Sequence, residues 1–169
     1  MTKTATTSNL RIRPIEPRDF AFIQSLASRL PAFTVPSNYI LWFFSRFHPD
    51  YCRVLERSST ETVAYLLAMP TSTPSMGIAI WQIAAVESAH ALVLEHFAAY
   101  LRDLVEATGS TSLFFTTQPS STQLRLIQVL AGQFGSCEVS KRDSVPAGQG
   151  EYEFSLFIGS QTKKGGNRL

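Results

Sequence analysis

The stretch Gly77–Val86 (GIAIWQIAAV) constrains the fold most, because it carries no charge and Gln82 is its one polar side chain. So apolar a run is typical of a strand with both faces buried. A helical pattern follows over Ala91–Ala107 and stops at Thr108-Gly109, and another strand pattern covers Ser112–Gln118. This strand–helix–strand order predicts a crossover within one sheet.

Shorter patterns on either side complete the predicted order. Alternation with period two predicts strands, and apolar stripes with period 3.6 predict helices. The strands are expected over residues 10–15, 51–57, 62–70, 136–141 and 151–158, and the helices over 18–30, 37–47 and 122–134. We therefore expect one α/β domain over residues 10–159, with a mixed central sheet of about 6–7 strands and helices on both faces. The polar ends, 1–9 and 160–169, are expected to be disordered tails.

Composition and spacing argue against several functions. The chain has 169 residues, of which 44% are hydrophobic and 17% charged, as in ordinary soluble globular domains. Its formal charge of +2 and its lack of a basic run argue against nucleic-acid binding. His90 and His96 do not share a helical face, so we expect no metal site. We also expect no membrane-spanning helix, no signal peptide and a cytoplasmic location, with Cys52 and Cys137 reduced in the core.

The junction WQIAAVESAHALVLEH, residues 81–96, passes directly from strand to helix. Comparable junctions in nucleotide- and coenzyme-binding proteins carry glycines, because their backbone N–H groups approach a phosphate. No glycine lies between Trp81 and Thr108 here. Any phosphate contact would therefore be made by backbone groups beside larger side chains.

Three segments resemble one enzyme superfamily. NYILWFFSRFHPDYCRVLE (38–56) is similar to a helix–strand segment entered by an Asn-Ser-x-Tyr signature, of which Ser37 and Tyr39 are present. IWQIAAVESA (80–89) is similar to a Trp-Gln-Val-Ala-Val strand, and TTQPSSTQLRLI (116–127) to a Thr-x-Thr-Pro-Ser-Asn junction. With the element order, these segments resemble the GNAT superfamily of acyl-CoA N-acyltransferases, and within it the diaminobutyrate acetyltransferases of ectoine synthesis.

The resemblance implies an N-acetyltransferase that uses acetyl-CoA and acts on a small amine or amino acid. The amine would attack the thioester directly, with strand backbone amides polarising its carbonyl. Tyr39 and Gln82 are the expected catalytic residues, which with Thr116 would hold a water that takes up the proton. A homodimer is expected by analogy. The resemblance implies coenzyme contacts at Ile83, Ala84, Ala85, Val86, His90, Ala91, Leu92, Val93 and Ser121, and substrate contacts at Ser37, Tyr39, Trp81, Gln82 and Thr116.

The sequence departs from the superfamily's coenzyme motif, Gln/Arg-x-x-Gly-x-Gly/Ala. His90 stands at the Gln/Arg position, Val93 at the glycine and Glu95 at the small residue. We expect Val93 to crowd a phosphate, and Glu95, if it faces the phosphates, to repel them by about 2–4 kcal/mol. The acidic positions of the diaminobutyrate subfamily read Thr34 and Phe114 here, so that diamine is a poor match.

The candidate site residues also have purely structural interpretations. Ser37 is a good N-cap and Tyr39 can be a packed tyrosine. Strand alternation places Trp81 and Gln82 on opposite faces of the sheet. Trp81 is then expected in the core, and Gln82, which needs a hydrogen-bond partner, is the better site candidate.

Two classes of function are left open by these observations. One is the N-acetyltransferase. The other is a catalytically inactive module of the same fold that binds another small ligand or a protein partner. The missing glycines, Glu95 and the lack of an acid or base on the central strand favour the module. The retained Trp81-Gln82 pair and the intact element order favour the enzyme, which is our preferred interpretation.

Overall fold

The computed structural model describes residues 10–30, 33–72, 77–117, 125, 128–129, 132, 137–143 and 152–158. These residues form one seven-stranded sheet in the order β1-β2-β3-β4-β5-β7-β6. The strands are β1 (Arg11–Pro14), β2 (Arg53–Ser58), β3 (Glu61–Pro70), β4 (Ile78–Ala85), β5 (Ser112–Thr117), β6 (Cys137–Asp143) and β7 (Tyr152–Ile158). The helices are α1 (Phe20–Ala27), α2 (Asn38–Phe47) and α3 (His90–Thr108). The helix expected over 122–134 falls mostly outside the described residues.

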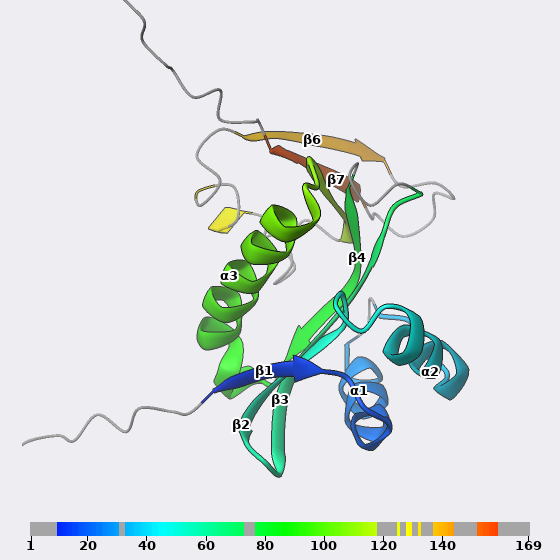
Figure 1. Cartoon of the computed structure of the whole chain (residues 1–169). Coiled ribbons are helices and arrows are strands. Elements are labelled where there is room, and N and C mark those ends of the chain that lie inside the picture. Colours follow the sequence, from blue (N-terminus) through cyan, green and yellow to red (C-terminus); the bar gives the residue numbers. More distant parts are fainter. Residues whose placement is uncertain are drawn as a thin grey trace, which may run out of the picture.

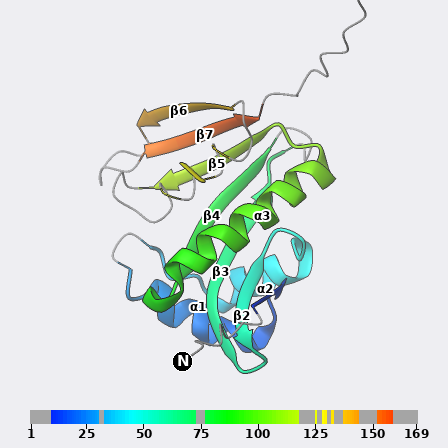
Figure 2. The ribbon, with the colours of Figure 1, turned by 90° about the vertical axis from the view of Figure 1, so that its left-hand side faces the viewer.

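Helices cover both faces of the sheet, which confirms the predicted α/β class (Figure 1). Helix α3 lies across one face, and α1 and α2 lie against the other, as the view turned by 90° also shows (Figure 2). The strands from β1 to β4 pair in antiparallel fashion, β4 and β5 pair in parallel, and β5, β7 and β6 are again antiparallel. The one parallel contact is the crossover predicted from the central segment.

Local signals explain where the helices begin and end. A short 3₁₀ turn over Pro17–Asp19 precedes α1, and the Glu16 backbone N–H donates to the Asp19 carboxylate at 2.8 Å. The Ser37 hydroxyl accepts from the backbone N–H of Ile40 at 3.3 Å and caps α2. Helix α3 ends at Gly109, whose φ of 65° is the left-handed conformation that favours glycine. None of the helices described is long and apolar enough to cross a membrane.

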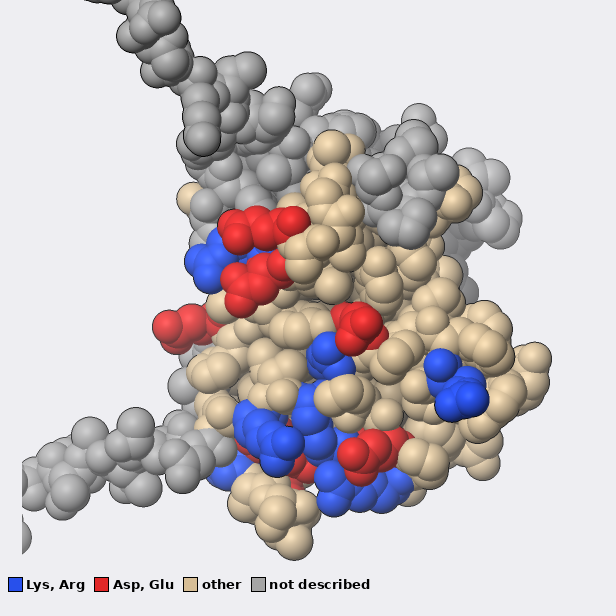
Figure 3. Space-filling view, in the orientation of Figure 1, with Lys and Arg blue, Asp and Glu red and all other residues tan. Residues whose placement is uncertain are grey.

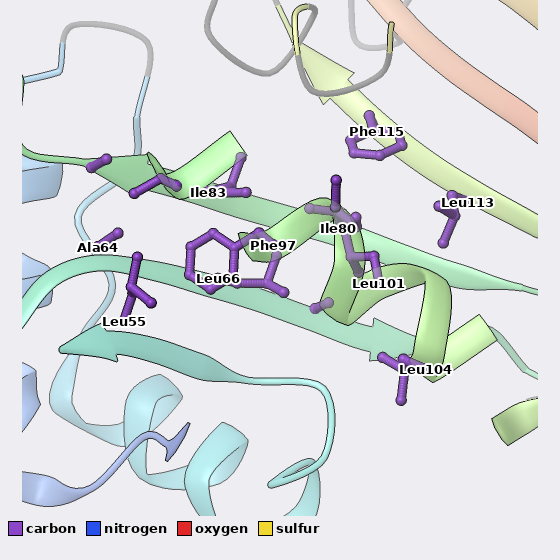
Figure 4. Close-up of a cluster of buried hydrophobic side chains, with 14 of the residues drawn as sticks. Leu55, Ala64, Leu66, Ile80, Ile83, Phe97, Leu101, Leu104, Leu113 and Phe115 are labelled. Carbon is purple, nitrogen blue, oxygen red and sulfur yellow. The ribbon is translucent and has the colours of Figure 1, made fainter. Parts of the chain in front are cut away.

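Two apolar cores lie on the two faces of the sheet. Between α3 and the sheet, Phe97 and Leu101 are fully buried against side chains of the central strands (Figure 4). The labelled members of this core are Leu55, Ala64, Leu66, Ile80, Ile83, Phe97, Leu101, Leu104, Leu113 and Phe115. The second core, under α1 and α2, contains Ile23, Leu41, Phe44, Cys52, Val54, Tyr65, Leu67 and Ala84.

Candidate functional site

Strands β4 and β5 run together only at their beginnings. β4 pairs with β5 over Ile78–Ile80, whereas it pairs with β3 as far as Ala85. β5 follows β7 instead, and the two central strands diverge toward their carboxyl ends (Figure 2). In an antiparallel strand alternate backbone groups point away from the partner. Beyond Ile80, such groups of β4 therefore point toward the side that β5 has left.

A β-bulge marks the point where the strands separate. Leu67 of β3 pairs with Gln82, and Ala68 pairs with Ile80, so Trp81 is an extra residue in β4. A bulge adds one residue to a strand and reverses the faces of all residues beyond it. Accordingly, Ile80 and Ile83 both belong to the α3 core.

The bulge places Trp81 and Gln82 on the same face of the sheet, which corrects the expectation from alternation. The Trp81 ring lies 5.6 Å from that of Phe44 on α2, measured between centroids. Gln82 is bonded to Tyr65, which lies in the same α1/α2 core. Trp81 is only half-buried, and Gln82 is buried. Both side chains therefore lie beside the divergence.

Gln82 has the hydrogen-bond partners that its burial requires. Its side-chain NH₂ donates to the backbone carbonyl of Thr34 at 2.7 Å, and its oxygen accepts from the Tyr65 hydroxyl at 3.1 Å. Burial raises the pKa of that hydroxyl, so Tyr65 stays a neutral donor. Gln82 thus ties the segment between α1 and α2 to the centre of the sheet.

Ser37 and Tyr39 are placed near that segment but face outward. Ser37 is exposed and serves as the N-cap of α2, as its structural interpretation predicted. Tyr39 is 68% exposed, and its ring lies 5.9 Å from that of Trp42. Over α2, Figure 3 shows a largely uncharged surface with one basic group, and Arg46 is the only charged residue of that helix.

The junction after β4 leads straight into α3. A 3₁₀ turn over Glu87–Ala89 follows the strand, and no side chain caps either this turn or α3. The His90 imidazole Nε2 lies 3.2 Å from the Ala85 carbonyl oxygen. The backbone N–H of His90 donates to the Glu87 carbonyl. Because the next N–H groups in the first turn of a helix have no partner within it, this end of α3 still presents N–H groups and the positive end of its dipole.

The expectation that Val93 crowds a phosphate is wrong. Val93 is only 2% exposed and packs in the core between α3 and the sheet. Its side chain lies one turn before that of Phe97 on the buried stripe of α3. Glu95 is exposed, and the first turn of α3 contains no acidic residue. The nearest acidic group before the helix is Glu87, which is also exposed.

Four of the expected site residues lie wholly or with their side chains outside the described part of the chain. Thr116 lies on β5 opposite Glu153 of β7, but its side chain is outside the described part, as are those of Ala91 and Leu92. Ser121 lies outside the described residues altogether.

A buried ion network was missed by the sequence analysis. Arg13 donates from Nη1 and Nη2 to the two oxygens of Asp19, both at 2.7 Å, and from Nε to Glu56 at 2.6 Å. All three side chains are buried, and the hydrogen bonds with Asp19 raise the pKa of the Arg13 guanidinium. Arg13 and Glu56 lie 43 positions apart in the sequence. No local pattern connects such partners.

Cys52 is fully buried, as predicted, and its thiol donates to the Ala68 carbonyl at 3.2 Å. Burial raises the pKa of the Cys52 thiol to about 12. The described side chains contain no cluster of three or more His, Cys, Asp or Glu residues suited to a metal ion.

Comparisons with known proteins identify the architecture. No protein-family model matches the sequence, and no curated protein matches it. Among solved structures, diaminobutyrate acetyltransferase EctA from Paenibacillus lautus, in complex with 2,4-diaminobutyric acid and coenzyme A, is 20% identical. The match covers 89% of this chain and 96% of that one, with a TM-score of 0.72.

Two further structures agree with this result. Ard1 from Thermoplasma volcanium is 12% identical over 89% of this chain and 99% of its own, with a TM-score of 0.64. A GNAT-family acetyltransferase from Bacillus anthracis is 13% identical over 88% and 95%, with a TM-score of 0.59. The chain therefore has the GNAT acetyltransferase fold.

Proposed function

We propose that the protein is an N-acetyltransferase that transfers an acetyl group from acetyl-CoA to a small amine. The coenzyme would lie along β4 beside Ile83–Val86, with its pyrophosphate at the first turn of α3, His90–Val93. Ser121 is proposed as a further contact. The fold supports this assignment, since EctA binds coenzyme A on the same architecture.

The main support for the proposal is that the open edge of β4 leads directly into the N-terminus of α3. The open edge of β4 ends at Ala85, and α3 begins at His90 without a side-chain cap. A ligand with amide groups at one end and phosphates at the other matches a strand edge followed by a helix N-terminus. Coenzyme A has both, in its pantetheine arm and its pyrophosphate. Because Val93 points into the core, it does not obstruct this approach.

The reaction would be a direct transfer within a ternary complex. The amine nitrogen forms a bond to the acetyl carbon, and the carbon–sulfur bond breaks. The second proton, which the nitrogen loses after attack, passes to the departing thiolate, so that coenzyme A leaves as the thiol. The ammonium loses its proton to water before attack, and backbone N–H groups of β4 would stabilise the oxyanion. Gln82 would act by holding the Thr34 carbonyl and the segment before α2 in place. Tyr39 and Thr116 are proposed to hold the water.

The test is thermal unfolding with and without acetyl-CoA. Saturation at a hundredfold excess over the dissociation constant adds about 2.7 kcal/mol, which for this chain length corresponds to roughly 5–10 °C. ATP at the same concentration is the control, because it has phosphates but no pantetheine arm to lie along β4. We expect a clearly larger shift with acetyl-CoA than with ATP. Without any shift at millimolar acetyl-CoA, the transferase assignment fails.

The alternative is an inactive module that uses the same surface for another ligand or a protein partner. The engagement of Gln82 by Thr34 and Tyr65 favours this reading, because a side chain so occupied is a poor proton acceptor. A shift with acetyl-CoA but no acetylation of any amine would support it. The expected homodimer is a separate proposal, and measurement of the mass in solution tests it.

A further inference from the structure

An apolar strip crosses the sheet on the α1/α2 face, beside the divergence of β4 and β5. Met69 of β3 pairs with Ala79 of β4, and Ala79 pairs with Phe114 of β5. Their sequence neighbours Ala68, Ile78, Ile80, Leu113 and Phe115 belong to the α3 core, so these three residues lie on the opposite face. Trp81 continues the strip at the bulge. All four side chains are half-buried, unlike the closed core on the other face.

Close contacts position the aromatic members of this strip. A Cβ atom on Gly77 would lie 2.6 Å from the Phe114 ring carbon Cε2, so the Phe114 ring packs where a side chain at 77 would be. The Trp81 ring packs against the Phe44 ring at a centroid distance of 5.6 Å, with the two ring planes tilted by 36°. The strip is therefore a built surface of two aromatic rings and two small or flexible apolar groups.

The segments of α1, α2, β3, β4 and β5 that surround the strip contain no carboxylate. Residues 20–49 carry no Asp or Glu, and residues 62–86 and 107–124 carry no charged residue at all. On the α1/α2 face, the carboxylates of Asp19 and Glu56 are already bonded to Arg13, far along the sheet toward the start of β3. Glu153 is placed closest by strand register, because it pairs with Thr116, two residues beyond Phe114. On the other side of β7, the residue opposite Glu153 in the strand register is Arg142 of β6.

We propose that the acceptor is a monoamine with an apolar, aromatic-sized body that lies on this strip, and that diamines are poor acceptors. This inference rests on the proposed acetyltransferase function. A second ammonium group would lose water against Trp81 and Phe114 without gaining a carboxylate partner, which is unfavourable. An aromatic body instead removes apolar surface of both partners from water and contacts the Trp81 ring.

Trp81 provides a direct readout of amine binding. The chain has two tryptophans, and Trp42 lies on the outer side of α2, so Trp42→Phe leaves Trp81 as the only one. Phenethylamine is titrated into this variant with and without coenzyme A, and 2,4-diaminobutyrate is the comparison ligand. We expect a saturable change of Trp81 emission with phenethylamine and at least about tenfold weaker binding of the diamine. Equal or tighter binding of the diamine would overturn the inference.

Acetylation rates give the second readout. We expect kcat/KM for phenethylamine to exceed that for 2,4-diaminobutyrate at least about tenfold. Trp81→Ala should remove most of this preference without changing the affinity for coenzyme A. Trp42→Ala, at an exposed position, is the matched control and should leave the preference within about twofold. If Trp81→Ala does not fold, Trp81→Leu keeps an apolar side chain and should reduce the preference only in part.

The outcomes separate this inference from the proposed function. Coenzyme A binding with a preference for the diamine would keep the acetyltransferase and refute the apolar acceptor. A diamine activity that Glu153→Gln abolishes would show that Glu153 supplies the missing carboxylate. If coenzyme A does not bind, the acetyltransferase fails, and the emission of Trp81 without coenzyme still decides whether the strip prefers the apolar amine.

Discussion

The two faces of the sheet are built differently. The face under α3 is closed by apolar side chains such as Phe97 and Leu101, which are fully buried. The face under α1 and α2 combines apolar packing with buried polar contacts, those of Gln82 and of Arg13. Its helix α2 also exposes Tyr39 and Trp42. The contrast indicates that the α3 face holds the fold together, while the other face positions the segments around the proposed acceptor site.

The largest effect is expected in the α3 core. Phe97→Ala should lower the free energy of unfolding by about 3–5 kcal/mol, because it removes a fully buried ring and leaves a cavity. For this chain length the midpoint of thermal unfolding should fall by roughly 10 °C. Trp42→Ala, on the exposed side of α2, is the control and should cost less than about 1 kcal/mol. Similar losses in the two variants would contradict the contrast between the faces.

Substitution of Val93 tests whether its side chain stabilises the core or obstructs the proposed coenzyme site at the start of α3. Val93→Gly should lower the free energy of unfolding by about 3 kcal/mol, from the lost core contacts and the poor helix propensity of glycine. Glu95→Gly, at an exposed position of the same helix, should cost only about 1 kcal/mol. Chemical denaturation measures both. If Val93→Gly left the stability unchanged and bound coenzyme A more tightly, the result would support the expectation from sequence that Val93 crowds a phosphate.

A smaller effect is expected for the hydrogen bonds of Gln82. Gln82→Leu should cost about 2 kcal/mol, because the buried Tyr65 hydroxyl loses its acceptor and the Thr34 carbonyl its donor. Hydrogen exchange should also speed up at residues 33–37, which the Gln82 amide holds against the sheet. Tyr65→Phe keeps the contact with Thr34 and is the matched control. Faster exchange in both variants alike would show that Gln82 does not hold this segment.

The smallest effect is a dependence of stability on alkaline pH. Burial raises the pKa of the Cys52 thiol from 9.0 to about 12, so the folded state favours the neutral thiol. The stability that this thiol contributes is fully present below pH 9 and is lost between pH 9 and about 12. By pH 10 the free energy of unfolding has fallen by about 1 kcal/mol. Cys52→Ala should weaken the fall in stability between pH 8 and pH 10. An identical fall in both proteins would assign it to other groups.

Most of the fold followed from local patterns. The uncharged run of β4, the cap Ser37 and the stop at Gly109 each depend on neighbouring residues, so the sequence alone located them. The inward position of Val93 also had a signal, since Val93, Phe97 and Leu101 follow the helical repeat. The expectation that Val93 faces a phosphate came instead from its alignment with the glycine of the coenzyme motif.

Two features of the candidate site had no local signal. The bulge at Trp81 is one extra residue in an apolar strand, and only its partner Leu67–Ala68 on β3 defines it. Without it, alternation assigns Trp81 and Gln82 to opposite faces. The hydrogen bond from Gln82 to Thr34 joins residues 48 positions apart, so it depends on the fold being in place. Site geometry is set by such long-range contacts more than by the elements themselves.

The central claim is that coenzyme A binds along the edge of β4 and at the start of α3. Amide-resolved hydrogen exchange with and without coenzyme A tests this most directly, because it reports the position of binding as well as its occurrence. We predict slower exchange at residues 81–85 and 90–93 in the presence of coenzyme A, and unchanged exchange on the outer side of α2. Protection confined to other segments, or no protection at saturating coenzyme A, would contradict the claim.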